Sequence, residues 1–259
     1  LDFKRSPHFH HQMSDTDMLE QKLYDLDPWK REMVIQNTGS WQLSEYCSIG
    51  CPGCGADSKK GDGLHLAKDS ARHIIDDYGD ILGKNRVFPW DASDPFDYES
   101  QDWNILDFYD YYGADIKLST AVPKGKEDLV LQAMKRNIIF TISLTPYRKN
   151  RIQPFLDFLE DNHPEYRKDF FDENTVWFNY GSETDPPNHP IICYHGILLT
   201  PTQIYARQVV PISKEHPHGQ ILTPVTNDDF FVPAFCDTFR FYGDKTFLQD
   251  TFHKIKTHD

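Results

Sequence analysis

The sequence is short of basic side chains and has no long hydrophobic run. Lys and Arg total 27 against 40 Asp and Glu, which gives a formal charge of −13. Because an acidic surface repels phosphate backbones, this balance argues against general nucleic-acid binding. No apolar run approaches the roughly 18–20 residues that span a bilayer, and no signal-peptide pattern opens the chain. We therefore expect a cytoplasmic protein that binds neither nucleic acid nor membrane.

The sequence also has no internal repeat and no low-complexity linker. It is well supplied with hydrophobic residues, at 39%, and with aromatic residues, at 14%, both more than a disordered chain carries. A chain of 259 residues is long enough to bury a substantial core. We expect a globular protein with one large domain, or one domain with an appendage.

Strand-like and helix-like segments alternate from residue 39 onward. The expected strands are residues 39–46, 86–90, 115–120, 138–144 and 175–180, and the expected helices are 66–82, 103–112, 126–136 and 152–162. This βαβα order predicts a parallel α/β architecture. A partial TIM-type barrel is the first choice, and a doubly wound open sheet is the alternative.

The two ends of the chain depart from this alternation. Residues 1–38 are polar and helix-prone around 15–26, and we interpret them as a leader segment that precedes a barrel core over residues 39–189. In the remaining part, 190–259, apolar segments of strand length follow one another without a helical pattern, which predicts antiparallel strands. We expect this C-terminal extension to close the barrel.

Cysteines are crowded into one short loop directly after the first expected strand. Cys47, Cys51 and Cys54 form a Cys-x3-Cys-x2-Cys motif, Cys-Ser-Ile-Gly-Cys-Pro-Gly-Cys. Such crowding suits a metal site in a reducing compartment better than a disulfide framework. Three thiolates can each bind one iron of a cubane cluster and leave the fourth iron open for chemistry. In a parallel α/β fold this loop lies at the face where active sites gather.

The motif, its place after the first strand and the alternation behind it resemble the radical S-adenosylmethionine (radical SAM) superfamily. The resemblance implies a partial (β/α)6 barrel in which Cys47, Cys51 and Cys54 hold a [4Fe–4S] cluster. It implies that the open iron binds S-adenosyl-L-methionine and that an electron from the cluster, delivered by a flavodoxin- or ferredoxin-type donor, cleaves the sulfonium. The resulting 5′-deoxyadenosyl radical abstracts hydrogen from a substrate.

The resemblance also assigns residues near strand ends to S-adenosyl-L-methionine: Ala92, Ser93, Asp94, Ser119, Ser143 and Asn179. The stretch 90–95, Trp-Asp-Ala-Ser-Asp-Pro, stands where relatives carry a Gly-Gly-Glu-Pro-like sequence that holds the methionine amino group. Its carboxylate is expected to accept a hydrogen bond from that ammonium group. An Asp-Pro turn without a ligand is the alternative for this stretch. The two later serines and Asn179 are expected near the carboxylate, ribose or adenine.

The substrate does not follow from the motif. An appended set of strands can bind an extended peptide by strand addition, which favours a ribosomally synthesised peptide (a RiPP precursor) as substrate. Epimerisation, crosslinking or backbone excision would then be the outcome, and a separate leader-peptide-binding protein would be an additional partner. A tailoring enzyme for a small molecule, such as a sugar, nucleoside or amino acid, is the alternative.

Interpretations without radical chemistry are also open. The cysteine motif and a nearby histidine such as His65 would make a zinc site in a non-catalytic scaffold, although a motif without a second cysteine pair is an incomplete zinc signature. A redox pair of Cys51 and Cys54 would leave Cys47 without a role. The two remaining cysteines are too few for a second cluster.

Overall fold

A computed structural model of the chain describes residues 14–50, 58, 63–84, 87–89, 91–113, 118–142, 149–166, 196–209 and 220–228. Its helices are α1 (Met18–Asp25), α2 (Pro28–Gln36), α3 (Lys68–Lys84), α4 (Ile105–Tyr112), α5 (Glu127–Lys135) and α6 (Lys149–Asn162), with 3-10 turns η1 (Pro95–Asp97) and η2 (Pro164–Tyr166). Its strands are β1 (Ser14–Thr16), β2 (Thr38–Trp41), β3 (Leu64–Leu66), β4 (Glu99–Ser100), β5 (Trp103–Asn104), β6 (Leu118–Thr120), β7 (Ile139–Ile142), β8 (Gly196–Leu199), β9 (Ile204–Val209) and β10 (Gln220–Pro224). The fold is therefore mixed α/β.

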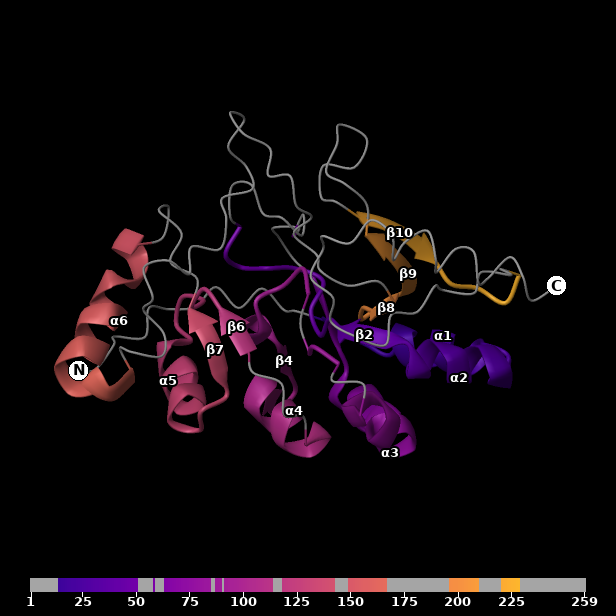
Figure 1. Cartoon of the computed structure of the whole chain (residues 1–259), viewed down its shortest axis with the longest axis horizontal. Coiled ribbons are helices and arrows are strands. Elements are labelled where there is room, and N and C mark those ends of the chain that lie inside the picture. Colours follow the sequence, from indigo (N-terminus) through magenta and orange to yellow (C-terminus); the bar gives the residue numbers. More distant parts are fainter. Residues whose placement is uncertain are drawn as a thin grey trace, which may run out of the picture.

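Many of the expected elements are present within a few residues of their predicted limits. The helices α3, α4 and α5 overlap those predicted at residues 66–82, 103–112 and 126–136. The strands β6 and β7 fall inside the predicted segments 115–120 and 138–144. Figure 1 shows α3, α4 and α5 in a row on one side of the strands, as the apolar side of each helix requires a sheet or core to pack against.

Parallel pairing joins strands that are distant in the sequence. The strand β2 pairs in parallel with β8, and on its other edge Ser40 forms a parallel bridge with Phe88. Trp41 N donates to Phe88 O at 2.7 Å, and Phe88 N donates to Gly39 O at 3.1 Å. Farther along the chain, β6 pairs in parallel with β7, and α5 provides the crossover that parallel neighbours need.

These pairings do not close into a barrel within the described residues. The paired strands there form a four-stranded sheet and separate two-stranded sheets. The expected strand at 175–180 lies outside the described residues. The partial TIM-type barrel therefore stays a prediction.

The C-terminal strands form an antiparallel meander, and this prediction is confirmed. Leu199 pairs with Ile204 across the β8–β9 turn, and Val209 pairs with Gln220 between β9 and β10. Because β8 also pairs with β2, the order of the four-stranded sheet is β10-β9-β8-β2 (Figure 1). The described C-terminal strands thus continue the sheet that leads into the cysteine motif.

The N-terminal segment contributes to the core as well. The strand β1 pairs in parallel with β3, and α1 buries Leu19 and Leu23 completely. The helix α2, which the sequence analysis did not predict, buries Val34 and Ile35. Pro28 is its first residue, a position where the missing N–H needs no partner.

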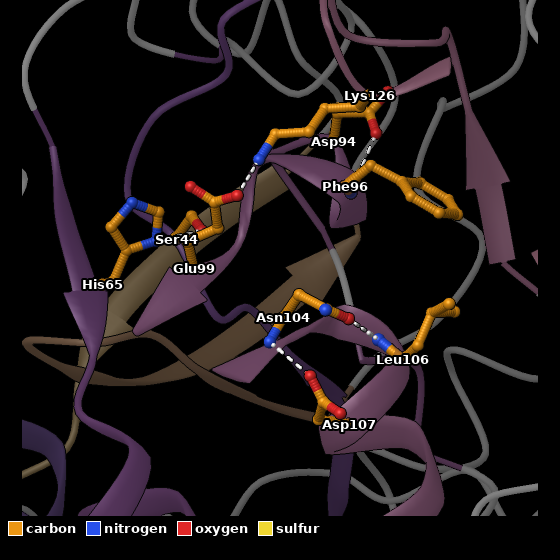
Figure 2. A network of polar contacts seen from close by, with 9 residues as sticks. All are labelled: Ser44, His65, Asp94, Phe96, Glu99, Asn104, Leu106, Asp107 and Lys126. Atoms are coloured by element: carbon orange, nitrogen blue, oxygen red, sulfur yellow. Dashed lines mark hydrogen bonds and ion pairs between the residues drawn. The ribbon is translucent and has the colours of Figure 1, made fainter. Parts of the chain in front are cut away.

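The core around β2 is aromatic. Trp41 is fully buried, and its ring lies edge-on to Phe108 at a centroid distance of 5.3 Å. Phe108 belongs to α4, which begins with a capping box: Leu106 N donates to Asn104 Oδ1 at 2.8 Å and Asn104 N donates to Asp107 Oδ2 at 3.0 Å (Figure 2). No helix in the described ranges is long and apolar enough to cross a membrane.

Candidate functional site

The loop over residues 91–97, which holds three of the predicted cofactor positions, is tied to the end of β2. Ala92 is fixed on both sides of its backbone, because its N–H donates to Gln42 Oε1 at 3.1 Å and its carbonyl accepts from Ser58 Oγ. Gln42 Nε2 in turn donates to the carbonyl of Ser44 at 2.6 Å. The chain that enters the cysteine motif and this loop are therefore held together by one buried amide side chain.

The Asp94 carboxylate joins the loop to the end of β6. Its Oδ1 accepts from Phe96 N at 3.1 Å (Figure 2) and from Thr120 Oγ1 at 2.9 Å, and its Oδ2 accepts from Ala121 N at 2.7 Å. Burial raises the pKa of Asp94 to about 7, the charge of Asp97 acts in the same direction, and the three donors oppose both. A carboxylate has about four acceptor positions, so the protein already uses most of them. The hydrogen bond from a cofactor ammonium group stays a prediction.

Cys47 lies directly beside Asp94. The residue is 7% exposed. Burial raises the pKa of the Cys47 thiol to about 12, the charges of Asp94 and Asp97 add to this shift, and the nearby backbone N–H groups of Ile49 and Asp94 oppose it. A bound metal would act in the opposite direction and deprotonate the thiol.

Asp97 connects the same loop to the residue that follows Cys47. Its Oδ2 accepts from Ser48 N at 2.8 Å, and the Ser48 hydroxyl lies nearby. The carboxyl is buried, at 3% exposed, and burial raises its pKa, whereas the bonds from Ser48 lower it. Asp97 is not among the predicted cofactor positions, and its residue type alone does not reveal a partner so distant in sequence.

Asp91, at the start of the loop, forms an ion pair with the C-terminal sheet. Arg207 Nη2 on β9 donates to Asp91 Oδ2, and the side chains of the two residues are 0% and 9% exposed. Removing one member of such a pair leaves an uncompensated buried charge. The pair therefore fixes the loop against β9.

The remaining predicted serines of the described residues lie close in sequence to these contacts. Ser93 is buried and precedes Asp94. Ser119 lies on β6 and is partly exposed, whereas its neighbour Thr120 is buried and makes the contact with Asp94. Alternation along the strand puts Thr120 on the same face as buried Leu118, a signal that favours Thr120 over Ser119 as the inward-facing hydroxyl.

Several predicted site residues lie outside the described residues: Cys51, Cys54, Ser143 and Asn179. Their roles stay predictions. Within the residues that the structure does describe, no three or more His, Cys, Asp and Glu side chains are grouped so that they could hold a metal ion. The structure brings together Cys47 and the loop that carries Ala92, Ser93 and Asp94.

No protein-family model, no curated protein and no solved structure matches the chain. The cysteine motif and the contacts of the 91–97 loop are therefore the features that bear on function.

His65, a candidate zinc ligand, is enclosed in the protein. Its ring is fully buried, its Nδ1 lies 2.8 Å from Ser44 Oγ (Figure 2), and the rings of Tyr46 and Tyr98 lie 5.6 and 5.8 Å from it. One of its two ring nitrogens is thus engaged within the protein. Burial lowers the pKa of His65 to about 4, and the nearby Glu99 and Lys126 act on it in opposite directions.

We expect His65 to make the protein less stable in mild acid. The ordinary pKa of 6.5 applies to the unfolded chain and about 4 to the folded one, so the unfolded chain takes up the proton first. This contribution to stability is complete above pH 6.5 and is lost as the pH falls toward 4. Between pH 7.5 and pH 5 it corresponds to a loss of about 2 kcal/mol.

Urea unfolding at these two pH values checks this expectation. The change in the free energy of unfolding between the two pH values should be about 2 kcal/mol smaller in His65→Gln than in the wild type. His73 gives a comparison of opposite sign: its hydrogen bond to Glu20 raises the pKa of His73, so His73→Gln should enlarge that difference and not reduce it. A pH dependence in His65→Gln equal to that of the wild type would contradict the assignment of this acid sensitivity to His65.

Proposed function

We propose that the protein is a radical SAM enzyme in which Cys47, Cys51 and Cys54 hold a [4Fe–4S] cluster that binds S-adenosyl-L-methionine. The observation that carries the proposal is the contact between the start of the cysteine motif and the 91–97 loop. These are the two segments to which the family resemblance assigns the cluster and the methionine amino group. They are distant in sequence, and their direct hydrogen bonding supports a shared site.

The chemistry of Cys47 fits a cluster ligand. Cys47 is buried, and the nearby backbone N–H groups of Ile49 and Asp94 favour a thiolate against the opposing effect of burial. N–H groups near a ligating sulfur also adjust the potential of an iron–sulfur cluster. When bound, the cluster with S-adenosyl-L-methionine supplies a 5′-deoxyadenosyl radical that takes hydrogen from the substrate. The protein's own part is to orient the bound groups and to exclude water from them.

The loop residues have the properties that this orienting function needs. Gln42 and Ser58 hold the backbone of Ala92 from two directions, which fixes the polypeptide where the methionine end of the cofactor is proposed to bind. Ser93 follows directly and offers a hydroxyl that both donates and accepts. We assign these residues to binding and orientation, and no residue of the chain to proton transfer.

A peptide is the proposed substrate. Strand β10 is the outer strand of the four-stranded sheet as far as the described residues extend, and Leu222 on it is 37% exposed. An extended peptide adds to an edge of this kind through main-chain hydrogen bonds. A small-molecule substrate would not use this edge.

The proposed function is tested by anaerobic reconstitution with iron and sulfide. We expect about four irons per chain, a reduced-cluster EPR signal that changes when S-adenosyl-L-methionine is added, and formation of 5′-deoxyadenosine. Cys51→Ala should lose the signal and the product. Stoichiometric zinc, with no cluster and no cleavage of S-adenosyl-L-methionine, would refute the proposal and favour a zinc-stabilised scaffold.

A further inference from the structure

One hydrogen bond joins the cysteine motif to a carboxylate of the 91–97 loop. The backbone N–H of Ser48, the residue after Cys47, donates to Asp97 Oδ2 at 2.8 Å. We call this bond the cysteine clamp. The backbone of Asp94 also lies near the Cys47 thiol, so the two segments meet at two points.

The clamp holds the motif at its first cysteine. Asp97 is 3% exposed, so its carboxylate is shielded from water that would otherwise compete for the Ser48 N–H. Asp97 belongs to η1, and its own backbone N–H donates to Asp94 O at 3.0 Å, which keeps the two acidic residues in one rigid turn. A buried carboxylate that accepts a backbone N–H makes one of the stronger hydrogen bonds in proteins.

We propose that Asp97 is a positioning residue that holds Cys47 in place for cluster binding before the cluster arrives. This inference rests on the proposed function. It adds that the loop which binds the methionine end of the cofactor also aligns the first cluster ligand. Fixing the first ligand in advance reduces the loss of conformational entropy that accompanies cluster binding.

The clamp itself is tested without any metal. In the reduced, metal-free protein, amide hydrogen exchange at Ser48 is measured by NMR in the wild type, Asp97→Ala and Asp97→Asn. Asp97→Ala removes the acceptor and should accelerate exchange at Ser48 roughly tenfold to a hundredfold. Asp97→Asn keeps an acceptor oxygen but loses the charge, which removes about half of the strength of the hydrogen bond. The Ser48 amide should therefore exchange only a few times faster in Asp97→Asn than in the wild type.

Asp107→Ala is the matched control, because Asp107 also accepts a backbone N–H, that of Asn104 at the start of α4. It should lower stability without changing exchange at Ser48. If the Ser48 amide exchanges at the same rate in Asp97→Ala as in the wild type, the clamp is overturned. If that variant does not fold, wild-type exchange in Asp97→Asn overturns it equally, since the lost charge must weaken the bond.

The role in cluster binding is tested by iron content after reconstitution. We expect Asp97→Ala to retain less than about a third of the wild-type iron, and Asp107→Ala to retain all of it. A full cluster in Asp97→Ala despite faster exchange would overturn the positioning role. A wild-type protein that binds no cluster would refute the proposed function, whereas the exchange measurement would still decide whether the clamp exists.

Discussion

Asp94→Ala is expected to destabilise the protein by roughly 3–5 kcal/mol. The side chain is buried and accepts hydrogen bonds from Phe96 N, Thr120 Oγ1 and Ala121 N. Alanine leaves these donors buried without a partner, and each such donor costs about 1–3 kcal/mol when water cannot reach it. Urea unfolding followed by circular dichroism at pH 7.5 measures the difference.

Two further variants show whether the loss of stability in Asp94→Ala comes from its three hydrogen bonds or from the removal of any carboxylate. Asp94→Asn keeps the shape and one acceptor oxygen but turns an amino group toward one of the donors, so its loss should be intermediate. Asp107→Ala removes a carboxylate that caps α4, where loss of a cap costs about 1 kcal/mol. A loss in Asp94→Ala no larger than that in Asp107→Ala would show that the Asp94 contacts do not stabilise the fold.

Trp41→Ala is the second substitution with a large expected effect, again roughly 3–5 kcal/mol. The ring is fully buried, and it lies edge-on to Phe108 at 5.3 Å and to Tyr112 at 6.1 Å. Alanine would leave a cavity among side chains of α4 that cannot collapse into it completely. Thermal unfolding should show a clearly lower midpoint.

Trp29 provides the matched control for Trp41. It is 55% exposed, and its described ring contact is with the ammonium group of Lys30 at 5.6 Å. Trp29→Ala should therefore change the free energy of unfolding by no more than about 0.5–1 kcal/mol. Equal losses in the two variants would contradict the placement of Trp41 in the core.

The sequence was informative where structure is set by local periodicity. Apolar spacing predicted α3 and α5, and the isoleucine-rich run 138–144 predicted β7. Each helix buries one side, and Ile139 and Ile142 of β7 are buried. The helix α2 was not predicted, since charged and aromatic residues such as Trp29 interrupt its apolar pattern. Its existence depends on tertiary packing of Val34 and Ile35.

The candidate site was only partly predictable for the same reason. The Asp-Pro pair identified the 91–97 loop, and the motif identified Cys47. The partners of this loop come from elsewhere in the chain, and Gln42, Ser48 and Thr120 belong to segments whose own sequence gives no sign of them. Hydrogen bonds between distant segments are a property of the folded chain, and a pattern read along a single sequence does not contain them.

The ion pair of Asp91 and Arg207 has a consequence for how this protein can change over generations. The two residues are 116 positions apart in the chain, and their side chains are nearly inaccessible to water. A lineage that replaced either residue alone would carry an uncompensated interior charge at a cost of about 3–5 kcal/mol, a large part of the stability of a typical domain. We therefore expect the two positions to be inherited as a unit, and a shortened descendant without β9 to have exchanged Asp91 for a neutral residue.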